Sequence, residues 1–244
     1  MAEDAIPRRG FLKGASAAGA AAATALSGTS ESIQAQTPAQ TAAPAGTAAG
    51  NADVSSWLTL TATEAAFLSA VYDTFIPADH LSPSGTACGL VTYIDRQLAG
   101  AWGAGARLYR GGPFLQGKPE HGYQLPLTPR EYFAAGIKAA NVWTRKTYGK
   151  DFDRLTPVER DAALKAMEAG KAEFADFNAR PFFEALYLSA MEGFFADPIY
   201  GGNRDKASWR MIGYPGLPAT YAHKALDWRG RKVVIAPKSI ADFS

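Results

Sequence analysis

Four charged side chains in the C-terminal third of the chain have the types and spacing of a reactive site. Glu192, Asp197, Arg204 and Asp205 fall within one short stretch. Carboxylates can exchange protons with a substrate, and an arginine can bind an anion through paired hydrogen bonds. One interpretation is therefore a self-sufficient enzyme with a carboxylate–arginine site. No nucleophile–base pair accompanies these residues, which weighs against that interpretation.

Other catalytic and metal-binding patterns are weak in this sequence. His80, His121 and His223 are far apart and fall in three expected loops, without the close spacing of a zinc site. The stretch 100–105 is rich in glycine, but no strand precedes it, so a turn is favoured over a nucleotide-binding fingerprint. No Gly-x-Ser-x-Gly sequence occurs. The residues therefore assign no catalytic, cofactor-binding or metal-binding position to this chain.

Charge and cysteine content narrow the function classes further. The chain has 25 Lys and Arg against 23 Asp and Glu, so neither nucleic acid nor an anionic membrane surface is implied as a partner. Cys88 is the single cysteine, which excludes an internal disulfide and favours a buried thiol over a bridge to another chain. Glu184 and Glu192 lie near one helix face, where interface or solvated carboxylates are commoner than a catalytic pair.

The stretch Glu192–Gly216 mixes aromatic residues with glycines, charges and prolines, which is not typical of a solvent loop. Trp209 and Tyr214 suit an interface because each joins a large apolar ring to one polar group. Three interpretations stay open: a loop folded over its own helices, a partner surface, and a sugar-binding module in which these two rings stack on a pyranose. The candidate partner interface comprises Glu192, Phe194, Phe195, Tyr200, Asn203, Arg204, Asp205, Trp209 and Tyr214.

The elements that must position these residues are helical. Three Thr-x-x-Glu capping boxes, at Thr61, Thr128 and Thr156, predict helix starts. Apolar residues at helical spacing extend this to helices over 62–76, 90–98, 129–148, 157–168 and 181–195. A long surface loop is expected over 99–127, and only 232–236 is typical of a strand. The fold class is therefore mainly α, an irregular helical domain with long ordered loops and at most a short C-terminal strand pair.

The N-terminus has the three parts of an export signal. Arg8 and Arg9 precede Phe11 and Leu12, and a weakly apolar run follows, which favours a twin-arginine signal over a general secretory one. We therefore expect a signal peptide over 1–35, with cleavage after residue 35 or 25, a disordered tether over 36–53 and a single helical domain over 54–244. A twin-arginine signal usually serves folded, cofactor-bearing cargo, yet this chain carries no cofactor motif.

The stretch that begins at Glu192 resembles the signature of the gluconate 2-dehydrogenase subunit 3 family. The matching residues, in order, are Glu192, Gly193, Asp197, Pro198, Tyr200, Gly201, Gly202, Asn203, Arg204, Asp205, Trp209, Gly213, Tyr214, Pro215 and Gly216. Segments 75–79 and 93–98 also resemble parts of the family, so the likeness spans about 60–216. One departure is Ser189-Ala190, where many members have a His-Thr pair.

The resemblance implies a non-catalytic small subunit of an exported dehydrogenase complex. Its partners would be an FAD-containing large subunit of the glucose–methanol–choline type, a multihaem cytochrome c subunit and the Tat translocase. FAD and haem c, with an iron–sulfur cluster as a further candidate, would belong to those partner subunits and none to this chain. The implied location is periplasmic, at the inner membrane through the complex. The implied substrate is gluconate, fructose, sorbitol or a similar compound, oxidised in the large subunit.

Overall fold

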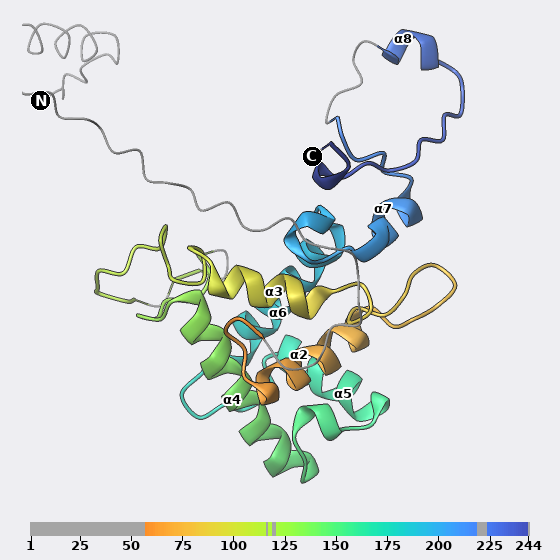
Figure 1. The fold of residues 1–244 in the computed structure, drawn as a ribbon. Helices are drawn as coiled ribbons and strands as arrows, with labels where there is room; N and C mark the ends of the chain where they lie inside the picture. Colours follow the sequence, from red (N-terminus) through yellow and green to blue (C-terminus); the bar gives the residue numbers. More distant parts are fainter. Residues whose placement is uncertain (1–56, 116, 119–120, 219–223, 244) are drawn as a thin grey trace, which may run out of the picture. The chain divides into compact units, whose positions relative to one another are not determined.

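The computed structural model describes residues 57–115, 117–118, 121–218 and 224–243, all within one compact unit over 52–244. The expected signal peptide and tether, with Arg8, Arg9, Phe11 and Leu12, lie outside the described residues, as does His223. Helices dominate the described part, as Figure 1 shows, and it contains no β-sheet. The mainly α fold class is confirmed.

The longer helices begin and end close to where the sequence predicts. They are α2 (Ala62–Phe75), α3 (Leu90–Ala99), α4 (Pro129–Tyr148), α5 (Pro157–Glu168) and α6 (Ala179–Phe195). All three predicted capping boxes are present, each with the threonine accepting from the backbone N–H of the glutamate three residues on. Helix α6 begins two residues earlier than predicted because Asn178 caps it through the backbone N–H of Arg180.

Helix α2 forms the centre of the core. It packs against α3, α5, α6 and the short 3₁₀ helix η2 (Phe152–Arg154), and Figure 1 shows α2 between α3 and α5. Phe67, Leu68, Val71 and Tyr72 of α2 are fully buried, as their helical spacing predicts. The ring of Phe67 lies 5.0 Å from that of Phe152. Burial of each such side chain stabilises the fold by about 1.5–3 kcal/mol.

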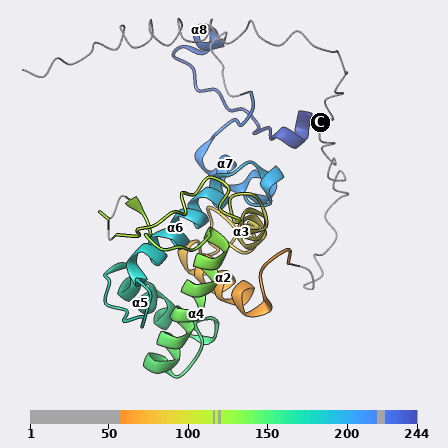
Figure 2. The same cartoon turned by 90° about the vertical axis from the view of Figure 1, so that its left-hand side faces the viewer.

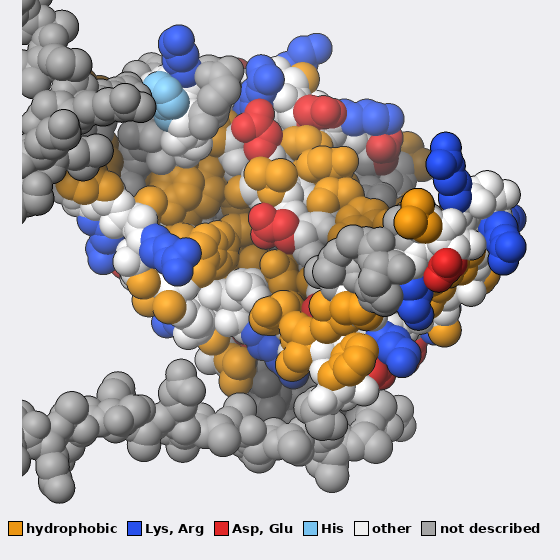
Figure 3. Space-filling view, turned by 90° about the horizontal axis from the view of Figure 1, so that it is seen from above, with side chains coloured by type: hydrophobic (Ala, Val, Ile, Leu, Met, Phe, Trp, Pro, Cys, Tyr) orange, Lys and Arg blue, Asp and Glu red, His pale blue; other side chains and the backbone are white. Residues whose placement is uncertain are grey.

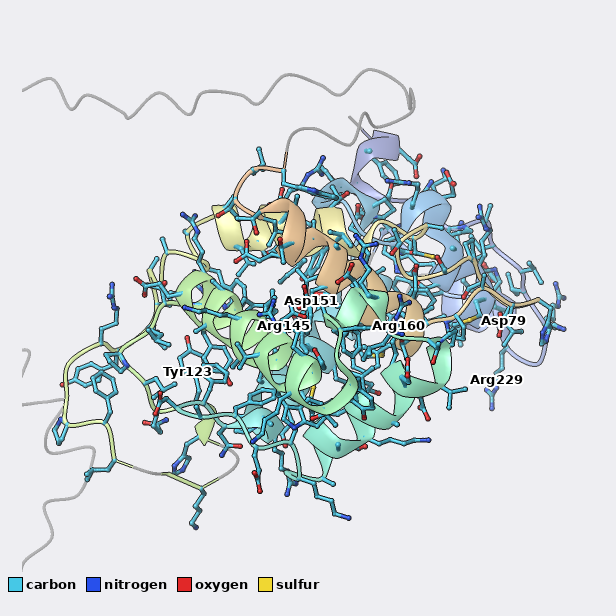
Figure 4. All side chains as sticks on the ribbon, turned by 90° about the horizontal axis from the view of Figure 1, so that it is seen from below. Asp79, Tyr123, Arg145, Asp151, Arg160 and Arg229 are labelled. Atoms are coloured by element: carbon cyan, nitrogen blue, oxygen red, sulfur yellow. The ribbon has the colours of Figure 1, made fainter. Side chains whose placement is uncertain are left out.

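The turn between α4 and η2 is fixed by side chains from α4. Asn141 accepts a hydrogen bond of 3.0 Å from the backbone N–H of Phe152. Arg145 pairs with Asp151 at 2.9 Å, and Figure 4 shows these two side chains beside each other. Gly149 ends α4 in the left-handed conformation at φ 75°, which a residue with a side chain adopts only at a cost. The turn therefore holds Phe152 against the central helix.

The C-terminal strand prediction is wrong. Residues 232–236 have no regular secondary structure and pair with no other described segment, and Val234 is 86 % exposed. The β-type contact in the described part is a single parallel bridge between Gly216 and Lys238. A run of β-branched residues specifies a strand only where a second segment supplies the hydrogen bonds of a ladder. The remaining elements are η3 (Pro198–Tyr200), η4 (Arg204–Lys206), α7 (Ala207–Ile212), α8 (Ala225–Trp228) and η6 (Ile240–Phe243).

Candidate partner interface

The stretch that follows α6 folds back onto α6 and α3 through closely approaching glycines. A Cβ added at Gly202 would lie 2.1 Å from the carbonyl oxygen of Gly193, and one at Gly89 would lie 2.3 Å from that of Gly201. Gly201 itself has φ 101°, a conformation that favours glycine. The Gly201–Gly202 turn is therefore fixed by backbone-to-backbone packing that a side chain would prevent.

Asn203 holds the turn to α7 from inside the protein. Its side chain is 0 % exposed and its φ is 45°, which asparagine tolerates better than most residues. Its Nδ2 donates to the carbonyl oxygen of Ala196 at 2.9 Å. Its Oδ1 accepts from the backbone N–H of Ser208 at 3.0 Å and from the Ser208 hydroxyl at 2.8 Å. Asn203 therefore joins the end of α6 to the beginning of α7.

Trp209 packs inward against the end of α6. It is 6 % exposed, and its Nε1 donates to the carbonyl oxygen of Phe195 at 2.9 Å. Tyr214 meets it edge-on, with ring centroids 5.1 Å apart, and Phe194 is buried as well. Trp209 thus offers no open face on which a pyranose could stack. The side chains of Phe194, Asn203 and Trp209 contribute to any interface by supporting its exposed members.

A C-terminal clasp, residues 238–243, adds a second constraint on the turn. Asp197 accepts from the backbone N–H groups of Ile199 at 3.0 Å and Ile240 at 2.9 Å. Lys206, a residue with φ 56°, pairs with Asp242 at 2.5 Å. Lys206 and the hydrogen bonds from Ser239 hold the pKa of Asp242 down at about 2. The clasp therefore contacts both ends of the turn.

An open depression, which we call the α3–α6 groove, lies beside this turn. It has a volume of about 390 Å³, and its lining comprises Tyr93, Gln97, Glu192, Phe195, Ala196, Asp197 and Tyr200. Tyr200 is 51 % exposed, and the neighbouring Phe195 and Ile199 are exposed to a similar degree. Figure 3 shows hydrophobic side chains gathered on one face of the molecule, with acidic ones among them and basic ones towards its edges. Of the exposed aromatic residues of the candidate interface, Phe195 and Tyr200 line this groove, whereas Tyr214 lies outside it.

Glu192 is an exposed carboxyl in the lining of the groove. Partial desolvation raises its pKa above the ordinary value, although a hydrogen bond from Tyr93 partly opposes that rise. Burial and the neighbouring Glu192 together raise the pKa of Tyr93 to about 12. Among the ion pairs of the described residues, none includes Glu192. Among the described residues, the carboxylate of Glu192 therefore accepts a hydrogen bond from a phenol and forms no ion pair with a cation.

The four residues of the carboxylate–arginine site are not brought together. Glu192 and Asp197 line the α3–α6 groove, and both oxygens of Asp197 accept backbone hydrogen bonds. Asp205 lines a different depression with Lys206, and Arg204 is exposed outside both. Within the described ranges, no group of three or more His, Cys, Asp or Glu side chains is placed to hold a metal ion.

A family model described as Gluconate 2-dehydrogenase subunit 3 matches residues 62–216, more than half of the sequence. The chain belongs to this family. The family is an accessory subunit of a dehydrogenase complex, and the resemblance stated from the sequence is confirmed. No curated protein and no solved structure gives a significant match.

Ser189 has a structural role in this member of the subunit 3 family. Ser189 is buried on α6, and its hydroxyl lies 2.9 Å from that of Tyr72 on α2. It also donates to the carbonyl oxygen of Leu186. Burial raises the pKa of Tyr72 well above its usual range, so this phenol stays protonated and able to donate. A pair of hydroxyls therefore joins the two helices here.

Sequence reasoning missed two contributions to the interface. Tyr93 and Gln97 of α3 form one wall of the groove, and Asp95 between them is buried where it accepts the backbone N–H groups of Leu58, Thr59 and Leu60. The likeness of segment 93–98 to the family was the available signal. The contact of Ile240 with Asp197 had no signal, because it joins segments far apart in the sequence.

Proposed function

We propose that this chain is the non-catalytic small subunit of an exported FAD-dependent dehydrogenase complex. It supplies the twin-arginine signal at Arg8 and Arg9 and stabilises the FAD-containing large subunit, which oxidises gluconate, fructose, sorbitol or a similar substrate. A multihaem cytochrome c subunit accepts the electrons, and the complex works at the periplasmic face of the inner membrane. Family membership supports the accessory role.

The α3–α6 groove is the observation that carries the partner proposal. Its exposed aromatic side chains, Phe195 and Tyr200, stand on a turn fixed by glycine packing and by Asn203. Binding energy in protein interfaces concentrates in a few large aromatic side chains on rigid supports, because little entropy is lost when they are covered. The groove has this arrangement, so we assign it to the large subunit.

Glu192 adds a chemical requirement for the partner. Glu192 forms no ion pair with the described residues, and a partner that covered its carboxylate with apolar groups would make that charge costly. A lysine or arginine from the large subunit would compensate the charge inside the interface. We therefore expect Glu192→Gln to weaken assembly, and Glu192→Lys to weaken it more through like-charge repulsion.

Co-purification with the co-expressed large subunit tests the groove. Tyr200→Ala removes an exposed aromatic side chain and should weaken assembly about 30-fold, the effect of losing a contact of roughly 2 kcal/mol. Tyr109→Ala is the matched control, because Tyr109 is exposed and lies outside the groove. Full assembly by the Tyr200 variant, with normal thermal stability, would contradict the assignment of the groove.

Fractionation of cells tests the export role. Replacement of Arg8 and Arg9 by lysine should leave the active flavoprotein inside the cytoplasm, since the large subunit travels on the signal of this chain. The same exchange at Arg107 and Arg110, outside the leader, is the control. Recovery of active flavoprotein from the periplasm when Arg8 and Arg9 are both lysine would contradict the export proposal.

A further inference from the structure

The segment 224–238, which we call the C-terminal loop, is strongly basic although the chain as a whole is nearly neutral. It contains one acidic residue, Asp227, and five cationic residues: Lys224, Arg229, Arg231, Lys232 and Lys238. The family match ends at residue 216, before this loop begins. The loop therefore lies outside the part of the chain that the family model matches.

Apolar side chains in the same loop are exposed. Leu226 is 82 % and Val234 is 86 % exposed, and Val233 is exposed beside them. Trp228 is partly exposed, with the ammonium of Lys224 at 5.7 Å from the centre of its ring. Cations interleaved with exposed aliphatic residues and a tryptophan are typical of segments that lie at a membrane–water interface.

The loop is attached firmly at its base. The backbone N–H of Lys238 donates to the carbonyl oxygen of Pro215 at 3.0 Å. The backbone carbonyl oxygen of Lys238 accepts from the N–H of Leu217 at 2.8 Å. Figures 1 and 2 both show the segment that carries α8 extending away from the helices α2 to α6. Its exposed side chains can therefore meet a flat surface without displacing any element of the core.

We propose that the C-terminal loop binds an anionic lipid surface. Lys and Arg side chains are attracted to lipid phosphates, while Leu226 and Val234 enter the boundary between headgroups and acyl chains. An acidic protein would also attract the cations. The exposed aliphatic side chains, spread singly along a loop and not around a pocket, favour the lipid surface. The proposal stands independently of the proposed partner, because it involves no residue of the groove.

Sedimentation of the full chain with vesicles tests this proposal. The vesicles contain either phosphatidylcholine alone or phosphatidylcholine with phosphatidylglycerol. We expect binding to the anionic vesicles, weakened as salt rises, because exposed charges are screened. Each surface cation contributes about fivefold in affinity, so replacing Arg229, Arg231 and Lys232 by glutamine should weaken binding roughly 100-fold.

A control of equal charge separates local from overall electrostatics. Replacing Lys138, Lys146 and Lys150, which are exposed on and after α4, by glutamine removes the same number of charges. This control should bind anionic vesicles within about twofold of the parent. Equal loss in the control and the loop variant would overturn the proposal, as would no loss in the loop variant.

The aliphatic contribution has its own variant. Leu226→Ser with Val234→Ser keeps every charge and should weaken binding about tenfold, because two apolar side chains no longer enter the lipid. All these side chains are exposed, so the melting temperature should stay unchanged. The lipid proposal is wrong if the parent chain does not bind anionic vesicles. It is also wrong if the parent binds an acidic protein instead and the loop variant loses that binding.

Discussion

Replacement of Asn203 by alanine tests the claim that the turn after α6 is fixed from inside. The substitution removes a buried side chain that makes three hydrogen bonds, one to Ala196 and two to Ser208. It leaves the carbonyl oxygen of Ala196 and the two donors of Ser208 without their partner. It also places alanine at φ 45°, in the left-handed region.

The expected loss follows from these contacts. Each buried group left without a partner costs about 1–3 kcal/mol, and we take the lower end of that range for each group. Three groups cost about 3 kcal/mol, and the left-handed alanine adds about 1 kcal/mol. The free energy of unfolding should therefore fall by about 3–5 kcal/mol. For a domain of this size the melting temperature should fall by roughly 10 °C.

Urea denaturation of the full chain measures this loss, and two further variants divide it. Asn203→Gly removes the same hydrogen bonds, but glycine adopts the left-handed backbone conformation without strain. It should therefore be about 1 kcal/mol more stable than Asn203→Ala. Asn178→Ala removes a cap with one exposed hydrogen bond and should cost only about 1 kcal/mol. If Asn203→Ala costs no more than Asn178→Ala, the turn is not held as argued.

Three other predictions concern the same region. Gly202→Ala places a Cβ at 2.1 Å from the carbonyl oxygen of Gly193 and should lower the free energy of unfolding by about 3 kcal/mol. Gly213→Ala is the control in the same urea assay. Gly213 has open space around it at φ 70°, so this change should cost about 1 kcal/mol. Partial desolvation raises the pKa of Glu192 above 4.5, so the folded state binds its proton more tightly than the unfolded state does, and its contribution to stability falls as pH rises past about 4.5. From pH 4 to pH 7 the free energy of unfolding of Glu192→Gln should therefore change more favourably than that of the parent chain, and an equal change in both would contradict this. Cys88 is buried, and burial also raises the pKa of its thiol. Ellman's reagent should therefore label this thiol only after denaturation. Rapid labelling of the native chain would contradict this prediction.

The helices could be predicted because their signals are local. A capping box needs only a threonine and a glutamate three residues apart, and the predicted starts at 62, 129 and 157 are those observed. In α6, Phe182, Leu186, Ser189 and Gly193 recur at helical spacing, and all four are buried. Such patterns depend on helix geometry alone, and so the rest of the chain does not alter them.

The arrangement of the turn could not be predicted, because it depends on segments distant in sequence. Composition placed Trp209 in a candidate interface, yet its ring lies inside because the carbonyl oxygen of Phe195 is within reach of its indole N–H. The strand expected over 232–236 failed for the reverse reason, since no distant segment came to pair with it. Whether an aromatic residue faces inward or outward is decided by such non-local neighbours.

If the turn binds the large subunit as proposed, its variants should affect both stability and assembly. The residues that match the family signature include buried ones, such as Gly202 and Asn203, and exposed ones, such as Tyr200. A buried change would lower assembly only by disordering the exposed residues, so added stability elsewhere should restore it. An exposed change would lower assembly at unchanged stability and no such addition would help. Measuring both quantities for each variant therefore separates the support of the interface from the interface itself.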